Sequence, residues 1–173
     1  PADPVAWSTA KVPLAMAVLR EQPTSQPSDA MRAAIDHSDN AAAQVLWAGL
    51  GEPETAKAKM EAVLREAGDP TVVQSVRVRP EFSAFGQSRW SISDQAAFLS
   101  HAACDPRNNA VFALMGEIQS DQHWGLGRIA DTQFKGGWGP APDGTYLVRQ
   151  FGVLPTAHGR IAVAVAAVDG SGT

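Results

Sequence analysis

The chain has 173 residues, 45% of them hydrophobic, and a net charge of -4 at pH 7. This length gives one compact domain with a sizeable core and is too short for two independent domains. The balance of 14 basic against 18 acidic residues, with no Lys/Arg run, excludes a nucleic-acid partner, and no apolar run approaches the roughly 18 residues of a membrane span.

The first predicted element is a helix in AWSTAKVPLAMAVLR, residues 6–20. It begins near Ser8 or Thr9, because Pro13 is tolerated cheaply only near a helix start. Its side chains are apolar on nearly every face, which is typical of a helix buried on all sides. Lys11, in the first turn of such a helix, therefore requires a functional explanation.

The middle of the chain is also predicted to be helical. Ser28 or Asp29 caps the first of these helices, and Ser91 and Asp94 have the spacing of a capping box. The segment 71–90 is irregular and extended. The predicted helices cover residues 28–37, 40–51, 53–68, 91–104 and 108–118.

The last third of the chain alternates with the period of strands. Strands are predicted at 132–138, 145–154 and 160–168, and the turn sequences APDG and TAHG between them favour an antiparallel meander. The fold class is therefore mixed α/β. We expect a single domain over 1–173, with a helical part at about 8–118 and a three-strand sheet at about 131–168.

Cysteine and histidine usage predicts neither a disulfide nor a metal site. Cys104 is the only cysteine, so no intramolecular disulfide can form. The four histidines are scattered without ligand-like spacing.

Ser8 and Lys11 form the first chemical motif, SxxK. Residues three apart lie on one helical face, so the hydroxyl and the amine are within reach of each other. A buried lysine can lose its charge through desolvation and accept the serine proton, which activates a weak nucleophile.

Two further motifs follow. In SDN, between two predicted helices, the Ser38 hydroxyl can relay a proton and the Asn40 amide can hold a substrate carbonyl. In KGG, at the end of a strand, Gly136 and Gly137 allow a substrate backbone to approach, while Lys135 attracts a carboxylate.

In this order, the three motifs resemble the signatures of the serine β-lactamases and penicillin-binding proteins: SxxK at a helix start, SxN between helices and KTG on a strand. The segments STAKVPLAMAVL and AAIDHSDNAAAQVL are similar to the family's motif segments beyond the motif letters. The resemblance, to class A β-lactamases in particular, runs from about Val5 to Val168. It implies an antiparallel sheet flanked by helices, an all-helical region, and an active site in the cleft between them.

The resemblance also implies roles for the motif residues. Ser8 would be the acylated nucleophile, Lys11 its proton acceptor and Ser38 a proton shuttle to the leaving group. Asn40 would bind the substrate amide, and Lys135 would fix the substrate carboxylate and support Ser38.

Backbone groups complete the implied site. The N–H groups of Ser8 and of Gly137 or Trp138 would form the oxyanion hole. Asp39 would brace the turn. Trp138 is the best candidate for a cleft wall, with Trp7, Trp90 and Trp124 as further candidates.

The sequence departs from the family pattern in several places. KGG lacks the hydroxyl that usually follows the strand lysine, which predicts weaker carboxylate binding. Arg128 or Arg149 could replace that ligand. The family begins with a helix and two strands before SxxK, whereas seven residues precede Ser8 here. Either those strands were removed, as in an N-terminally truncated chain, or the sheet is reduced to three.

Deacylation is the least defined step. Class A β-lactamases use a loop glutamate, followed by an asparagine, to hold the hydrolytic water. Glu81 is the comparable residue here, but no asparagine follows it nearby, and most loop glutamates are simply solvated. An enzyme that acylates well and deacylates slowly is therefore as consistent with the sequence as a true β-lactamase.

Two functions remain open. One is a serine hydrolase or transferase that acts on a β-lactam, a D-Ala-D-Ala-like peptide or a small ester. The other is a non-catalytic cell-wall or ligand-binding domain that keeps the cleft. The resemblance further implies an exported location and a small-molecule or peptidoglycan-peptide substrate, and the serine mechanism needs no cofactor or metal. We expect a monomer.

Overall fold

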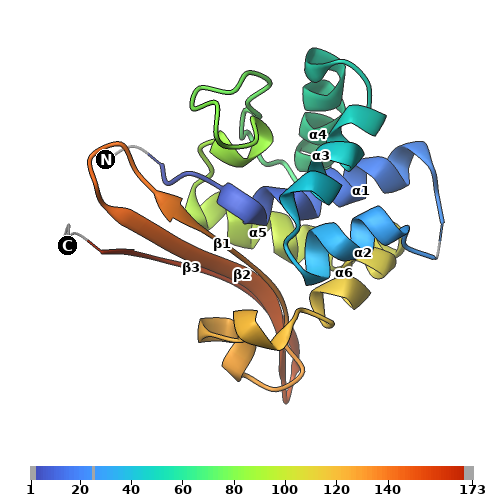
Figure 1. The fold of residues 1–173 in the computed structure, drawn as a ribbon. Helices are drawn as coiled ribbons and strands as arrows, with labels where there is room; N and C mark the ends of the chain where they lie inside the picture. Colours follow the sequence, from blue (N-terminus) through green and yellow to red (C-terminus); the bar gives the residue numbers. More distant parts are fainter. Residues whose placement is uncertain (1–2, 25, 170–173) are drawn as a thin grey trace.

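The computed structural model of the protein describes residues 3–24 and 26–169. It combines helices with an antiparallel sheet, the mixed fold class that the sequence predicts (Figure 1). The helices are α1 (Lys11–Glu21), α2 (Asp29–Asp36), α3 (Asn40–Gly49), α4 (Pro53–Glu66), α5 (Ile92–Ala102) and α6 (Asn109–Met115). The strands are β1 (Gln133–Pro140), β2 (Tyr146–Thr156) and β3 (Gly159–Asp169).

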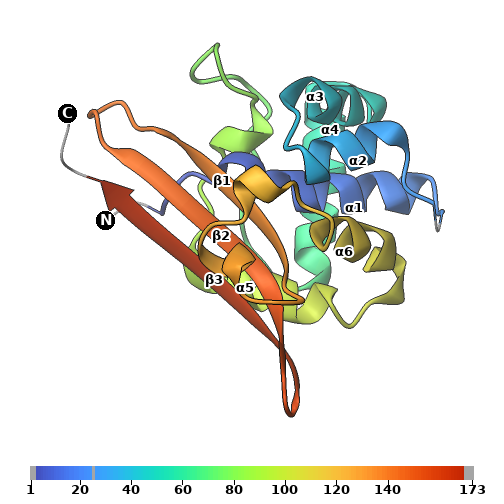
Figure 2. The same ribbon diagram turned by 60° about the horizontal axis from the view of Figure 1, so that its bottom comes forward.

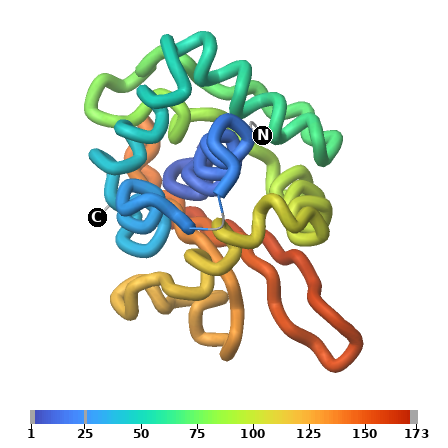
Figure 3. The backbone as a smooth tube through the Cα atoms, turned by 90° about the vertical axis from the view of Figure 1, so that its right-hand side faces the viewer, coloured from blue at the N-terminus to red at the C-terminus, as the bar shows by residue number. Residues whose placement is uncertain are grey.

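Helix α1 is the centre of the molecule. Viewed end-on in Figure 3, it is surrounded by the other helices and the sheet. Every side chain from Lys11 to Ala17 is buried, as expected for a helix that is apolar on nearly every face.

The α-helix begins at Lys11, later than the predicted start at Ser8 or Thr9. The preceding turn, η1 (Trp7–Ala10), is a 3-10 helix, in which the Thr9 amide donates to Ala6 O at 3.2 Å. This tighter i to i+3 bonding delays the first α-helical turn.

The predicted caps of two helices are present, and a third helix is capped by Asp39, a residue expected only to brace the turn. The Ser28 hydroxyl accepts the Met31 amide at the start of α2, and the Ser91 hydroxyl accepts the Asp94 amide at the start of α5. Asp39 caps α3 by accepting the amide of Ala42. These caps satisfy orphan N–H groups and fix where each helix starts.

The sheet has the order β1-β2-β3, with both pairs antiparallel. Helices pack on one side of it, as Figure 2 shows. In the register, Lys135 lies opposite Phe151, which in turn lies opposite Ala164. Phe151 is fully buried and its ring meets Trp90 edge-on at 5.5 Å, so this face of the sheet is part of the core.

No helix in residues 3–24 and 26–169 is both long and apolar enough to cross a bilayer.

The packing of Phe151 predicts that Phe151→Ala lowers the free energy of unfolding by about 3–5 kcal/mol, because it leaves a cavity between the sheet and α5. Chemical denaturation followed by circular dichroism measures this change. Val76→Ala, at a side chain that is 68% exposed, is the control and changes stability by less than about 0.5 kcal/mol. Equal effects of the two substitutions would contradict the assignment of Phe151 to the core.

Candidate active site

Ser8 lies on the η1 turn, directly before the buried α1 helix. The residue before it, Trp7, has a φ of 49°, a left-handed conformation that is strained for a tryptophan. Strain of this kind costs about 1–3 kcal/mol and persists only where the surroundings enforce it. Here the Ala6 amide donates to Ser88 O at 2.8 Å, and a β-bridge joins Val5 to Arg89.

Two buried polar side chains hold the same turn from the sides. The Thr9 hydroxyl donates to Ala6 O and accepts the Gln95 amide at 2.8 Å, which ties η1 to α5. Arg149, from β2, donates to the carbonyls of Pro4 and Val5 at 3.1 and 2.9 Å. The chain on both sides of Ser8 is therefore anchored.

Arg149 does not replace the missing carboxylate ligand, contrary to one expectation from the sequence. Besides its bonds to residues 4 and 5, it donates to Trp90 O at 3.0 Å, and it does not line the cleft. Desolvation by burial lowers the pKa of its guanidinium to about 10. Arg128, the other candidate, is exposed and also does not line the cleft.

Glycines on β1 let the strand approach the η1 turn that carries Ser8. A Cβ atom on Gly137 would lie 2.9 Å from the Ser8 amide nitrogen and 3.0 Å from both Ala6 O and Thr9 N. A Cβ on Gly139 would lie 2.5 Å from the Trp7 ring. Any side chain at these positions would push β1 away from Ser8, so the glycines are required for this contact.

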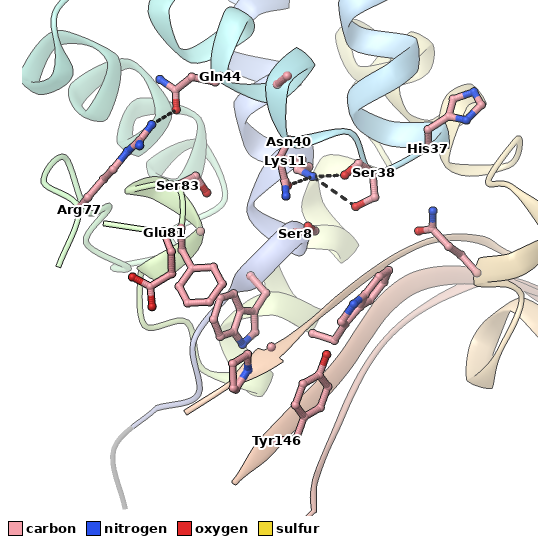
Figure 4. Close-up of a pocket in the computed structure, with 18 of the residues that line it drawn as sticks. Ser8, Lys11, His37, Ser38, Asn40, Gln44, Arg77, Glu81, Ser83 and Tyr146 are labelled. Carbon is pink, nitrogen blue, oxygen red and sulfur yellow. Dashed lines mark hydrogen bonds between the residues drawn. The ribbon is translucent and has the colours of Figure 1, made fainter. Parts of the chain in front are cut away.

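Lys11 is 1% exposed and joins the first two motifs. Its Nζ donates to Ser38 O at 2.5 Å, Asn40 Oδ1 at 2.8 Å and Ser38 Oγ at 3.3 Å (Figure 4). These three acceptors use all three protons of the ammonium group, and none of them belongs to Ser8. The neutral amine would give up one of these bonds and gain a lone pair that can accept a proton.

The pKa of Lys11 is lowered from 10.5 to about 8. Desolvation by burial is the larger cause, and the negative charge of Asp39 acts in the opposite direction. A substantial fraction of Lys11 is therefore a neutral amine at mildly alkaline pH.

Ser38 connects two buried lysines. Its hydroxyl oxygen lies 2.9 Å from Lys135 Nζ and 3.3 Å from Lys11 Nζ. Because the oxygen accepts from both lysines, the Ser38 hydroxyl proton remains free to be donated to another group. Ser38 itself has a φ of 56°, so the loop between α2 and α3 is strained at the serine.

Lys135 lies behind Ser38 and does not line the cleft. It is fully buried and also donates to Gly136 O at 3.0 Å. Desolvation lowers its pKa well below the ordinary 10.5, and the nearby charge of Lys11 lowers it further.

A cleft of about 750 Å³ lies between the helical part and β1. Ser8, Lys11, Ser38 and Asn40 line it, as does Trp138, which is 39% exposed. The other aromatic and proline side chains in its lining are Trp7, Phe82, Trp124, Pro140 and Tyr146.

Trp90 is the tryptophan candidate that does not line the cleft. It is buried, and its indole N–H donates to Asp69 Oδ2 at 2.6 Å. It belongs to the core between α5 and the sheet.

Glu81 lines the cleft but is not directed at Ser8. Its carboxylate is exposed and lies 3.1 Å from the Arg79 guanidinium. Figure 4 shows it pointing away from Ser8. Glu81 is therefore a solvated loop carboxylate, the interpretation that its place in the sequence favours.

Several cleft residues were not singled out from the sequence, among them Gln44, Arg77 and Tyr146. Arg77 donates to Gln44 Oε1 at 3.2 Å across the cleft wall. The loop that carries Arg77 has no regular periodicity, so no sequence signal could place it. Within the described ranges, no three His, Cys, Asp or Glu side chains gather as a metal-binding group.

The chain has the fold of class A β-lactamases. It superposes on the TLA-3 extended-spectrum β-lactamase with a TM-score of 0.75 at 15% identity, covering 96% of this chain and 77% of that one. A class A β-lactamase from Bacteroides cellulosilyticus gives 0.72 at 16% identity, covering 97% and 76%. An ancestral class A β-lactamase, GNCA, gives 0.67 at 22% identity, covering 99% and 80%. No protein-family model and no curated protein sequence matches the chain.

The charge balance around Lys11 predicts the effect of Asp39→Asn. Asparagine keeps the helix cap but removes the negative charge that raises the pKa of Lys11, so this pKa falls below about 8. The pH titration of the Lys11 ¹³Cε chemical shift, assigned with Lys11→Met, measures it. Asp29→Asn, in the first turn of α2, is the control. An unchanged or higher pKa in Asp39→Asn would contradict the electrostatic description.

Proposed function

We propose that the protein is a serine hydrolase or transferase of the penicillin-recognising type, which forms an acyl-enzyme on Ser8. Its substrates would be a β-lactam, a D-Ala-D-Ala-like amide or a small ester. The observation that carries the proposal is the pair of buried lysines, Lys11 and Lys135, that converge on the Ser38 hydroxyl beside Ser8. A domain that only binds a ligand has no need for two desolvated lysines, because burying each amine lowers the free energy of unfolding.

In the acylation step, Ser8 Oγ forms a bond to the substrate carbonyl carbon, and its proton passes to the neutral amine of Lys11. The lowered pKa of Lys11 makes this amine available near pH 8. The Asn40 side chain, which borders the cleft, would hold the acyl amide. The amide of Ser8 and that of Gly137 or Trp138 would stabilise the oxyanion.

The bond to the leaving group then breaks, and the leaving nitrogen or oxygen takes the Ser38 proton. Ser38 regains a proton from the Lys11 ammonium group, which lies 3.3 Å from its oxygen. Lys135, 2.9 Å from the same oxygen, stabilises the serine while its proton is in transit.

Deacylation requires water to attack the ester carbon and lose a proton to a base. Glu81 is paired with Arg79 and turned away from Ser8, so it does not serve as this base. We propose that Lys11 acts as this base and that deacylation is slow. An exported location and peptidoglycan peptides as substrates fit this chemistry and belong to the same proposal.

Intact-protein mass spectrometry tests acylation. After incubation with a penicillin, a cephalosporin and an activated ester, the protein gains the mass of at least one acyl group, and Ser8→Ala does not. Ser100→Ala, at an exposed position on α5, keeps the adduct. If folded protein forms no adduct with any reagent, the non-catalytic binding domain becomes the better description.

The position of Glu81 predicts that Glu81→Gln leaves the decay rate of the adduct within about twofold of wild type. The reason is that its carboxylate is screened by Arg79 and does not face Ser8. The time course of adduct loss after removal of excess reagent measures the rate. Decay more than tenfold slower in Glu81→Gln would show that Glu81 activates the hydrolytic water.

A further inference from the structure

The end of the cleft beside Ser38 is built differently from a site for a negatively charged group. Strand residue Gly136 has no side chain, and the space beside it is filled by indole rings. A Cβ atom at this position would lie 3.1 Å from Trp124 Cζ2 and 3.5 Å from Trp138 Cζ3. The two rings meet edge-on, with centroids 6.1 Å apart. An apolar surface therefore lies where KTG, the family's strand motif, places a hydroxyl.

The cations near this surface are not available to a ligand. Lys135 is fully buried behind Ser38 and donates to Ser38 Oγ and Gly136 O. Lys11 already has three acceptors. Arg149 is bonded to main-chain carbonyls in the core.

The remaining charged residues of the cleft divide between its two ends. Arg77 and Glu81 lie on the opposite side of Ser8 from Ser38 and His37 (Figure 4). Among the described residues that line the cleft, Arg77 is the one arginine, so the only guanidinium is far from the Ser38 end.

A carboxylate, Asp121, lines the Ser38 end. It lies on the turn η4 (Ser120–Gln122), and the adjacent Gln119 amide donates to Asp36 O at 3.0 Å. Asp36 immediately precedes His37, so this bond holds η4 beside the end of α2. Asp121 is exposed and borders the cleft, where it would repel an anionic substrate group.

We propose that this cleft selects esters or amides whose leaving group carries no carboxylate, and that an uncharged aromatic leaving group packs against Trp124 and Trp138. This inference rests on the proposed acylation of Ser8 and narrows its substrates to small esters and uncharged amides, because penicillins, cephalosporins and D-Ala-D-Ala-like peptides carry a carboxylate on the leaving-group side. Burial against the indole rings favours an apolar group, while a carboxylate there would lose water and gain no free cation.

A matched pair of esters tests the inference: 3-carbamoylphenyl and 3-carboxyphenyl phenylacetate. They share the acyl group and differ by an amide in place of a carboxylate on the leaving phenol. The second-order rate constant for acylation of Ser8 is measured by mass spectrometry at pH 8. Each value is divided by the alkaline hydrolysis rate of the same ester, which removes differences in intrinsic reactivity.

The expected result is a corrected rate at least about tenfold higher for the carbamoyl ester. Asp121→Asn lowers this ratio about threefold or more, because it removes the like charge. Glu52→Gln is the matched control: it removes one charge at an exposed position that does not line the cleft, and it leaves the ratio unchanged.

Three outcomes would overturn the inference. If the carboxyphenyl ester acylates Ser8 as fast as the carbamoyl ester, the inference fails while the proposed function stands. A ratio that is unchanged in Asp121→Asn overturns it as well, because Asp121 supplies the repulsion. If neither ester labels Ser8 and no β-lactam does, the proposed function fails and the inference fails with it.

Discussion

The site depends on two lysine side chains that are buried together around one serine hydroxyl. Lys11 and Lys135 are both shielded from water, and each pKa is lowered mainly by desolvation. Between about pH 8 and the ordinary lysine value of 10.5, the unfolded chain binds more protons at Lys11 than the folded one. The free energy of unfolding therefore rises with pH across this window, and the burial of Lys11 destabilises the fold at neutral pH. Hydrogen bonds from both amines to Ser38 offset part of that cost.

The surrounding architecture serves to hold these groups in place. Helix α1 carries Lys11 through the centre of the molecule, and β1 brings Lys135 to the same serine. Among the described residues, three non-glycines have positive φ: Trp7 and Ser38, where the motifs meet the cleft, and Asp131, which lies just before β1. Buried polar side chains such as Gln95 and Arg149 tie the η1 turn and the residues before it to α5 and to β2.

The sequence predicts the helices, the strands and the meander because each has its own periodicity and caps. The buried position of Lys11 also follows from the sequence, since the helix around it is apolar on nearly every face. Three things could not be predicted. The 3-10 turn at Ser8 depends on tertiary contacts of η1. Arg149, which the sequence offers as a possible carboxylate ligand, donates to main-chain carbonyls in the core. The position of Glu81 depends on an irregular loop. For the 3-10 turn and Arg149 the deciding contacts come from residues distant in sequence, whereas Glu81 pairs with Arg79 on the same irregular loop.

The likeness to class A β-lactamases, at 14–22% identity, concerns the fold, and the chemistry rests on the residues of this chain. The central claim is that Lys11, as a neutral amine, accepts the proton of Ser8. The pH dependence of the single-turnover acylation rate tests it most directly, with an ester that has no titrating group. We expect this rate to rise with pH, with a midpoint of about 8, and to be constant above it. A rate independent of pH between 6 and 10, after correction for alkaline hydrolysis, would contradict it.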